Sequence, residues 1–324
     1  MADIGPIEAE VNDEGVDIRD DESTTSITPS VCEQEDYQGR CYVNSKHGNY
    51  LVPIDDRQQM AQDIIHHSST LILDDKLYLA PISDCPQRIL DVGTGTGIWA
   101  IEIADEFPSA QVIGIDIAPI QPKVVPPNLE FQFDDAQLDW TFRPESFDFI
   151  HIRHLQGSIK DWEKLYRQVF KALKPGGWFQ HMEPDLQMRS ENPDVNVDDR
   201  HVFTKWANVF REVGSKTEQT FAFSSDILNK LAEGAGFVSI NTRTHKVPIG
   251  WWPKDEKLKN IGAFVGAGFL EALDGYAKKP LCQVLGWSPE DMEVFLVKMR
   301  NAIADRTTRT TGQIFSVYAQ KPQH

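Results

Sequence analysis

The chain has 324 residues, of which 40% are hydrophobic and 25% are charged, a balance typical of globular proteins. No apolar run approaches the roughly 18 residues of a membrane-spanning helix, and the start of the chain lacks the apolar stretch of a secretory signal. The formal net charge of −17 argues against direct nucleic-acid binding, which needs a clustered basic surface.

The acidic charge is concentrated at the start of the chain. Residues 1–36 contain 12 acidic residues and one arginine, a net charge of −11, and show no hydrophobic periodicity. Such a segment cannot bury enough apolar surface to offset its ordering entropy. We therefore predict a disordered acidic tail over 1–36, order beginning near Tyr42, and one folded domain over 37–324. The four cysteines form no CxxC pair and no zinc-binding spacing, so we expect free thiols.

Beyond the tail, the pattern favours an α/β fold. A helix is expected after Pro53, with Met60, Ile64 and Ile65 near helical spacing. Strands are then expected at 88–92, 111–116, 129–136, 147–152 and 177–183, and helices at 97–107 and 158–173. This alternation predicts a doubly wound, seven-stranded, mostly parallel sheet with a core over 86–183. The remaining segments predict helices at 198–215, 224–235, 254–275 and 288–304, and strands at 237–250 and 312–322. The helices within about 195–215 and 254–304 are read as insertions.

A glycine-rich turn, Asp91-Val92-Gly93-Thr94-Gly95-Thr96-Gly97, joins the first core strand to its helix. A phosphate-binding P-loop is excluded because no lysine follows Gly97. The dinucleotide pattern G-x-G-x-x-G fits poorly, since the third glycine comes one residue early. Because glycine lets a ligand approach the main chain closely, the turn suits an adenosyl amino acid, which has no pyrophosphate. A glycine-rich turn without a ligand is the alternative.

Acidic residues follow the next two strands. Asp116 ends the strand at 111–116, where a carboxylate can accept hydrogen bonds from vicinal ribose hydroxyls. Asp135 and Ala136 lie at the end of the strand at 129–136, where an acid could meet an adenine amino group and a small residue leaves room for the base. Each acid could instead be a solvated strand end. The predicted cofactor site comprises Asp91, Gly93, Thr94, Gly95, Gly97, Asp116, Ile117, Asp135 and Ala136.

The motifs RILDVGTGTG, GIDIAP, FDDA, FDFIHIRHL and LKPGGWF occur in the order found in class I S-adenosylmethionine (SAM)-dependent methyltransferases, which residues 86–183 resemble. The flanking segments NYLVPIDDRQQMAQDIIHH, PIGWWPKDEKLKNIG and VYAQKP resemble the LaeA-like fungal methyltransferases over roughly residues 40–322. This resemblance implies a Rossmann-like fold and SAM as cofactor. Members of this group control fungal secondary metabolism or modify small metabolites.

Methyl transfer is an in-line displacement that needs a base only if the acceptor must lose a proton. His154 is the predicted base, because imidazole titrates near neutral pH, and Glu183 is a second catalytic candidate. Either could instead have a structural role. Trp251 and Trp252 could wall a substrate pocket or simply pack. The pair His66 and His67 has no third ligand nearby, so no metal is expected.

Two functions remain open, and a minor third is a SAM-binding fold that has lost methyl transfer and serves other chemistry. The chain could methylate a small metabolite, with the inserted helices covering the acceptor. It could instead be a regulatory subunit of a protein complex that affects chromatin or development, with weak or protein-directed activity. Both agree with a small-molecule or protein methyl acceptor and with a cytoplasmic or nuclear location.

Overall fold

A computed structural model describes residues 34–44 and 50–323. Its central sheet has the order β5-β4-β3-β6-β7-β10-β8. In addition, β9 pairs with β10 along the edge opposite to β7. The pairs among β3 to β7 are parallel, and β10 is antiparallel to each of its neighbours. The predicted seven-stranded sheet is confirmed, with the two-residue β8 as an addition. The strands are β3 (Arg88–Val92), β4 (Gln111–Asp116), β5 (Leu129–Phe133), β6 (Phe147–Arg153), β7 (Leu173–Pro184), β8 (Arg189–Ser190), β9 (Val238–Pro248) and β10 (Thr310–Gln320).

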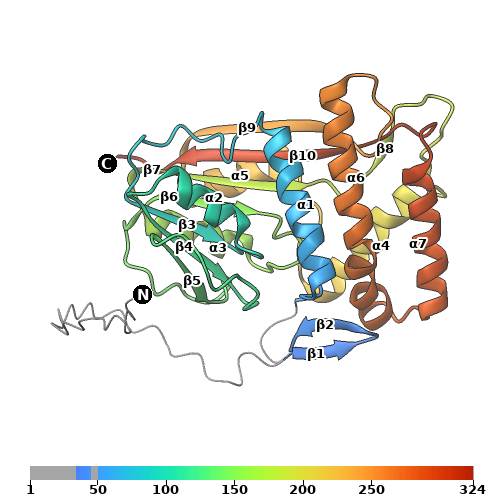
Figure 1. Cartoon of the computed structure of the whole chain (residues 1–324), viewed down its shortest axis with the longest axis horizontal. Helices are drawn as coiled ribbons and strands as arrows, with labels where there is room; N and C mark the ends of the chain where they lie inside the picture. The colour runs from blue at the N-terminus through green and yellow to red at the C-terminus, as the bar shows by residue number, and fades with distance from the viewer. Residues whose placement is uncertain (1–33, 45–49, 324) are drawn as a thin grey trace, which may run out of the picture.

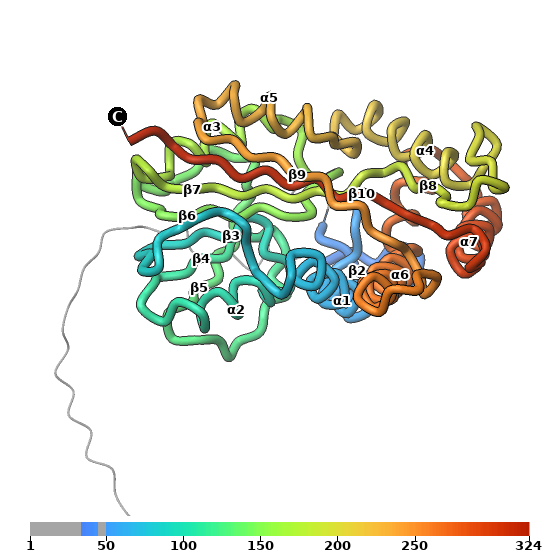
Figure 2. The backbone as a smooth tube through the Cα atoms, turned by 90° about the horizontal axis from the view of Figure 1, so that it is seen from above, coloured from blue at the N-terminus to red at the C-terminus, as the bar shows by residue number. Residues whose placement is uncertain are grey.

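Helices cover both faces of the sheet, as expected for strands that are apolar on both sides. Figure 2 shows α3 (Trp162–Ala172) and α5 (Ser225–Ala235) on one face, and α1 (Asp56–Ile72) and α2 (Ile98–Glu106) on the other. On α3, Leu165, Tyr166 and Val169 recur at helical spacing and are fully buried against the sheet. On α2, Trp99 and Ile103 are buried in a second core cluster.

The inserted helices form a group at one end of the sheet (Figure 1). They are α4 (Val202–Thr217), α6 (Glu256–Ala277), the π-helix η3 (Lys278–Val284) and α7 (Pro289–Ala304). These helices share a hydrophobic cluster that includes Phe203, Leu273 and Leu296. Helix α6 also packs against α1, so the inserted group contacts the first helix of the domain. Within the described ranges, no helix has both the length and the hydrophobicity to cross a membrane.

An N-terminal hairpin, β1 (Gln34–Tyr37) and β2 (Arg40–Val43), corrects the predicted start of the domain. Most of the predicted tail lies outside the described residues, but Gln34–Tyr37 form a strand. Regular structure therefore begins before residue 37, the predicted domain start, and before Tyr42, where order was expected. Arg40 is 7% exposed and forms ion pairs of 2.6 Å with Asp55 and 2.7 Å with Asp274. These contacts tie the hairpin to distant parts of the chain, which short-range periodicity could not reveal.

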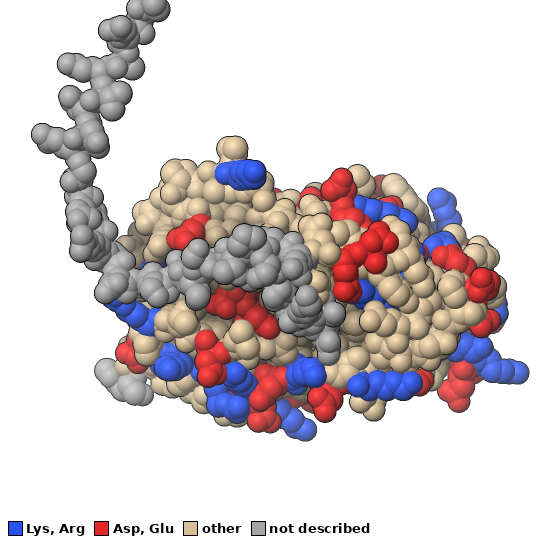
Figure 3. Space-filling view, turned by 90° about the horizontal axis from the view of Figure 1, so that it is seen from below, with Lys and Arg blue, Asp and Glu red and all other residues tan. Residues whose placement is uncertain are grey.

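The face shown in Figure 3 presents no single basic area on its described part. On the described part of the face in Figure 3, lysine and arginine side chains alternate with aspartate and glutamate side chains. Nucleic-acid binding needs positive charge gathered on one face. This distribution therefore gives no support to a nucleic-acid partner.

Candidate functional site

A cavity of about 310 Å³ lies at the carboxyl ends of the parallel strands. Loops from β3, β4, β5 and β6 meet there because parallel strands end at the same edge of the sheet. The cavity continues past the ends of β7 and β10 and is walled by α1, α4 and α6. It therefore extends from the glycine loop, on the β4 side of the sheet, to the inserted helices.

The glycine loop borders this cavity with little side-chain bulk. Gly93 and Gly95 have φ values of +69° and +58°, a left-handed backbone that favours glycine. The Thr94 hydroxyl donates to Asp91 Oδ2 at 2.6 Å, and Asp91 Oδ1 lies 2.8 Å from Nδ1 of His151. Asp91 thus connects the loop to His151 of β6. The cavity is lined by all four predicted residues of this loop: Asp91, Gly93, Thr94 and Gly95.

Asp116 lies beside this loop at the end of β4. Its two carboxylate oxygens accept hydrogen bonds from the Gly95 and Ala118 amides, each at 2.8 Å. A carboxylate has about four acceptor positions, so both oxygens can accept further bonds from a ligand. Burial raises the pKa of Asp116 to about 6, against the opposing effect of the two amides. Ile117 also lines the cavity.

Asp135 and Ala136 line the same end of the cavity, after β5. Asp135 Oδ1 accepts from the Gln137 amide at 2.9 Å, which fixes the turn. Gly97, in contrast, is absent from the cavity wall. Its φ is +83°, and an added Cβ would lie 2.3 Å from the Phe131 ring. Gly97 therefore lets the helix start pack on β5, a different role from the predicted ligand contact.

The side of α1 that faces the cavity is polar. Gln58, Gln62 and His66 recur every four residues and therefore share one face of the helix, and all three line the cavity. Both amide atoms of Gln58 and Oε1 of Gln62 are buried without a hydrogen-bond partner. Met60, expected on the buried face, is 60% exposed. This face was not among the predicted site residues, although the regular spacing of its polar residues was a signal for it.

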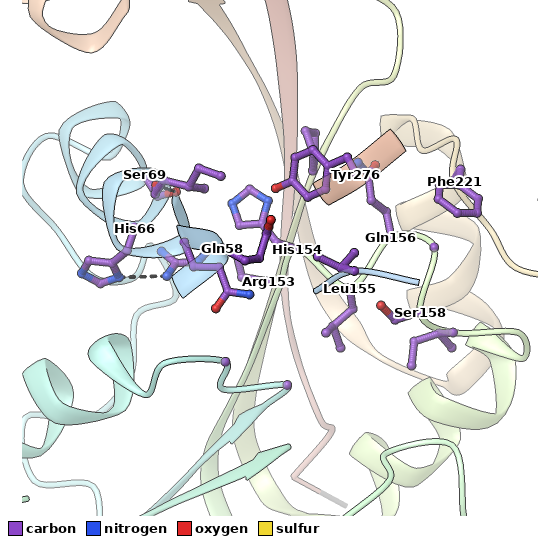
Figure 4. A pocket seen from close by; sticks show the side chains of 18 of the residues that line it. Gln58, His66, Ser69, Arg153, His154, Leu155, Gln156, Ser158, Phe221 and Tyr276 are labelled. Carbon is purple, nitrogen blue, oxygen red and sulfur yellow. Dashed lines mark hydrogen bonds between the residues drawn. The ribbon is translucent and has the colours of Figure 1, made fainter. Parts of the chain in front are cut away.

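Arg153, the last residue of β6, and His154, which follows it, line the cavity opposite α1 (Figure 4). Arg153 Nη2 lies 2.8 Å from Nδ1 of His66, and Nε2 of His66 lies 2.9 Å from Glu102. Burial lowers the pKa of Arg153 to about 10, so its guanidinium stays charged at neutral pH. Burial and the charge of Arg153 lower the pKa of His66 to about 3, so His66 is neutral and can accept from Arg153.

His154 lines the cavity with a backbone φ of +57°. Its Nε2 is buried and has no hydrogen-bond partner. Burial, followed by the charge of Arg153, lowers the pKa of His154 to about 3. The expectation that this imidazole titrates near neutral pH is therefore wrong, and His154 presents a neutral ring to the cavity.

Glu183 is fully buried and is absent from the cavity wall. Its oxygens accept from the Leu155 and Gln156 amides at 2.7 and 3.2 Å, and Oε1 lies 3.0 Å from Nε2 of His181. The structure thus corrects its predicted catalytic position. Glu183 instead holds the loop after β6, and that loop forms part of the cavity wall.

The far end of the cavity, which we call the distal half, lies among the inserted helices. Apolar residues wall it, including Leu186, Met188, Ile249 and Val265. Five aromatic side chains, which we call the aromatic arc, complete the wall: Trp206 and Phe210 of α4, Phe221, and Phe269 and Tyr276 of α6. Their helical spacing, at i and i+4 on α4 and i and i+7 on α6, was the sequence signal available for them.

The other aromatic candidates lie elsewhere. Trp251 is 60% exposed, and Trp252 donates its indole N–H to the Thr310 carbonyl at 2.8 Å. Neither lines the cavity, so of the two interpretations of Trp251 and Trp252 the pocket wall is wrong. His67 packs edge-on against Phe264, at 4.4 Å between ring centres. Across the described ranges, no group of three histidine, cysteine or acidic side chains could hold a metal.

The chain is similar to a known protein family and to several fungal proteins. The model of the methyltransferase domain family matches residues 64–241. Methyltransferase pytC of Aspergillus terreus is 36% identical over 318 residues, which cover 98% of this chain and 97% of that protein. Secondary metabolism regulator LAE1 of Cochliobolus heterostrophus is 32% identical and covers 93% and 99%. Protein-methionine methyltransferase laeA of Emericella nidulans is 30% identical and covers 88% and 75%.

Proposed function

This chain belongs to the methyltransferase domain family, and from that premise we propose that it methylates a small molecule bound in the distal half of its cavity. It is a SAM-dependent methyltransferase related to pytC and to the LaeA secondary metabolism regulators. The observation that carries the proposal is one cavity with two unlike ends. One end is bordered by bare backbone, carboxylates and unpaired amides, and the other by apolar and aromatic side chains.

The polar end fits an adenosyl amino acid. Asp116 has acceptor positions left for the ribose hydroxyls, and Asp135 and Ala136 would meet the adenine. The buried, unpaired amide groups of Gln58 and Gln62 are otherwise costly, and the charged amino acid portion of SAM would satisfy them. When bound, SAM supplies a methyl group on a positively charged sulfur.

The protein promotes the transfer mainly by positioning the acceptor, and less by acid–base catalysis. The loop after β6, fixed by Glu183, presents His154 between the polar end and the distal half. Its neutral ring cannot remove a proton in advance from an acceptor of ordinary pKa. It can accept a hydrogen bond from the acceptor and orient it for in-line attack. We therefore propose His154 as an orienting residue.

Two measurements test this function. Isothermal titration of the folded chain with S-adenosylhomocysteine tests the polar end, and the absence of binding would refute the cofactor assignment. Incubation with methyl-tritiated SAM and either a metabolite extract or a nuclear protein extract tests the acceptor. We expect the label in organic-soluble small molecules, and label confined to protein would reject a small-molecule acceptor.

A protein acceptor is the second candidate, and one residue favours it. Met188 is 5% exposed and lines the distal half of the cavity, and one relative is named a protein-methionine methyltransferase. Transfer to the Met188 sulfur would make the chain its own methyl acceptor. Such self-methylation would suit a regulatory protein. Intact-mass analysis after incubation with SAM would show a mass gain of one methyl group that Met188→Leu abolishes.

A further inference from the structure

The distal half of the cavity is lined by a continuous series of aromatic rings. Phe221 and Phe210 lie 5.5 Å apart between ring centres, Phe210 and Trp206 4.5 Å, Trp206 and Phe269 5.4 Å, and Phe269 and Tyr276 6.5 Å. Their interplanar angles lie between 45° and 68°, so the arc presents both faces and edges. Such surfaces favour another flat ring, by offset stacking or edge-to-face contact.

Charge in the cavity is confined almost entirely to the polar end. Among the described residues of the wall, Arg153 is the only lysine or arginine, and it bonds His66 of α1. In the part of the distal half that the structure describes, Asp185 is the one charged side chain, and it already pairs with Arg189 at 2.8 Å and accepts from the Gln187 amide at 3.0 Å. A charged acceptor would lose its hydration there without gaining an ionic partner, which is strongly unfavourable.

Two polar groups mark the point where the halves meet. His154 Nε2 is buried without a partner, and in Figure 4 the Tyr276 hydroxyl points toward the His154 ring. Both side chains line the cavity. A buried, unpaired nitrogen is costly unless a ligand supplies its hydrogen bond. The ligand that fits here therefore carries a hydrogen-bond donor next to a flat, apolar body.

We propose that the methyl acceptor is an uncharged, flat aromatic alcohol, whose rings lie against the aromatic arc and whose hydroxyl bonds His154 and Tyr276. This inference rests on the proposed function. In the transfer, the hydroxyl oxygen forms a bond to the methyl carbon as the bond from that carbon to sulfur breaks. The electron pair stays on sulfur, which becomes an uncharged thioether. His154 first orients the neutral hydroxyl, in the tautomer that carries its own proton on Nδ1. As the new bond forms, the developing positive charge on oxygen makes the hydroxyl proton strongly acidic, and the proton then passes to Nε2 of His154.

A series of small probes on the unmodified chain tests the acceptor class without any substitution. Isothermal titration in the presence of S-adenosylhomocysteine would compare 2-naphthol with three analogues. Naphthalene-2-carboxylate replaces the hydroxyl by a charged acceptor, decahydro-2-naphthol is neither aromatic nor flat, and naphthalene lacks the hydroxyl. We expect 2-naphthol to bind at least tenfold more tightly than each analogue. Equal or tighter binding of the carboxylate or of the saturated alcohol would overturn the proposal. The titration of S-adenosylhomocysteine alone reports the cofactor function separately, so the two failures are distinguishable.

Substitutions then locate the binding site. Trp206→Leu should weaken 2-naphthol binding at least tenfold and leave S-adenosylhomocysteine binding within twofold. Trp251→Leu, which removes an exposed indole outside the cavity, is the matched control and should bind 2-naphthol like the unmodified chain. His154→Ala should abolish the preference for 2-naphthol over naphthalene. An unchanged preference in His154→Ala, or equal losses in the two tryptophan variants, would overturn the assignment.

Discussion

Asp116 offers the most direct test of the cofactor site, because its pKa makes ligand affinity depend on pH. Burial raises this pKa to about 6 in the free protein, and only the ionised carboxylate is a full acceptor for two ribose hydroxyls. Coupling of proton release to binding predicts affinity for S-adenosylhomocysteine about elevenfold lower at pH 5 than at pH 8. His66 and His154, with pKa values of about 3, stay neutral across this range.

The variant Asp116→Asn removes both the charge and the titration. Losing two charge-assisted hydrogen bonds should cost about 3 kcal/mol, or roughly 150-fold in affinity, and the remaining binding should no longer change between pH 5 and 8. Isothermal titration at several pH values measures both effects. Asp139→Asn is the control, since Asp139 is 94% exposed and lies outside the cavity. A pH-independent affinity in the unmodified chain, or wild-type affinity in Asp116→Asn, would refute the reasoning.

Three further predictions concern stability. The pKa values of His66 and His154 are lower in the folded chain than in the unfolded chain, so the stability that they contribute above pH 6.5 is lost on acidification. With the opposing shift of Asp116, the free energy of unfolding should fall by about 2.5 kcal/mol from pH 7 to 5. Urea titrations at both pH values check this, and a rise at pH 5 would contradict it. Arg40→Gln leaves two carboxylates without their buried partner and should cost about 3 kcal/mol; an unchanged urea midpoint would show that the hairpin contributes little. Gly97→Ala forces a Cβ onto the ring of β5 at positive φ and should cost about 2 kcal/mol, while a thermal midpoint equal to wild type would exclude this packing role.

The sequence determined most of the sheet and much of the polar end of the cavity. The strands at 88–92 and 111–116 agree with β3 and β4 at every residue, because buried parallel strands are short apolar runs bounded by turn residues. The positions of Asp91, Gly93, Gly95 and Asp116 around one cavity also followed from the pattern. Local sequence fixes these loops, since each directly follows its strand.

Tertiary structure alone decided the roles of single side chains whose neighbours are distant in sequence. Glu183 was expected at the end of the correct strand, but only the fold places the amide of Leu155 at 2.7 Å from its carboxylate and keeps it out of the cavity. His154 was found as a cavity residue, but its pKa depends on burial and on Arg153.

The distal half of the cavity likewise required the fold. Trp206 and Phe269 are far apart in the chain, and their rings meet because α4 and α6 pack into one cluster at the end of the sheet. Hydrophobic periodicity shows that a helical face is buried, but it cannot show whether that face meets another helix or a ligand cavity. That distinction depends on packing across the whole chain, which local sequence does not encode in any one segment.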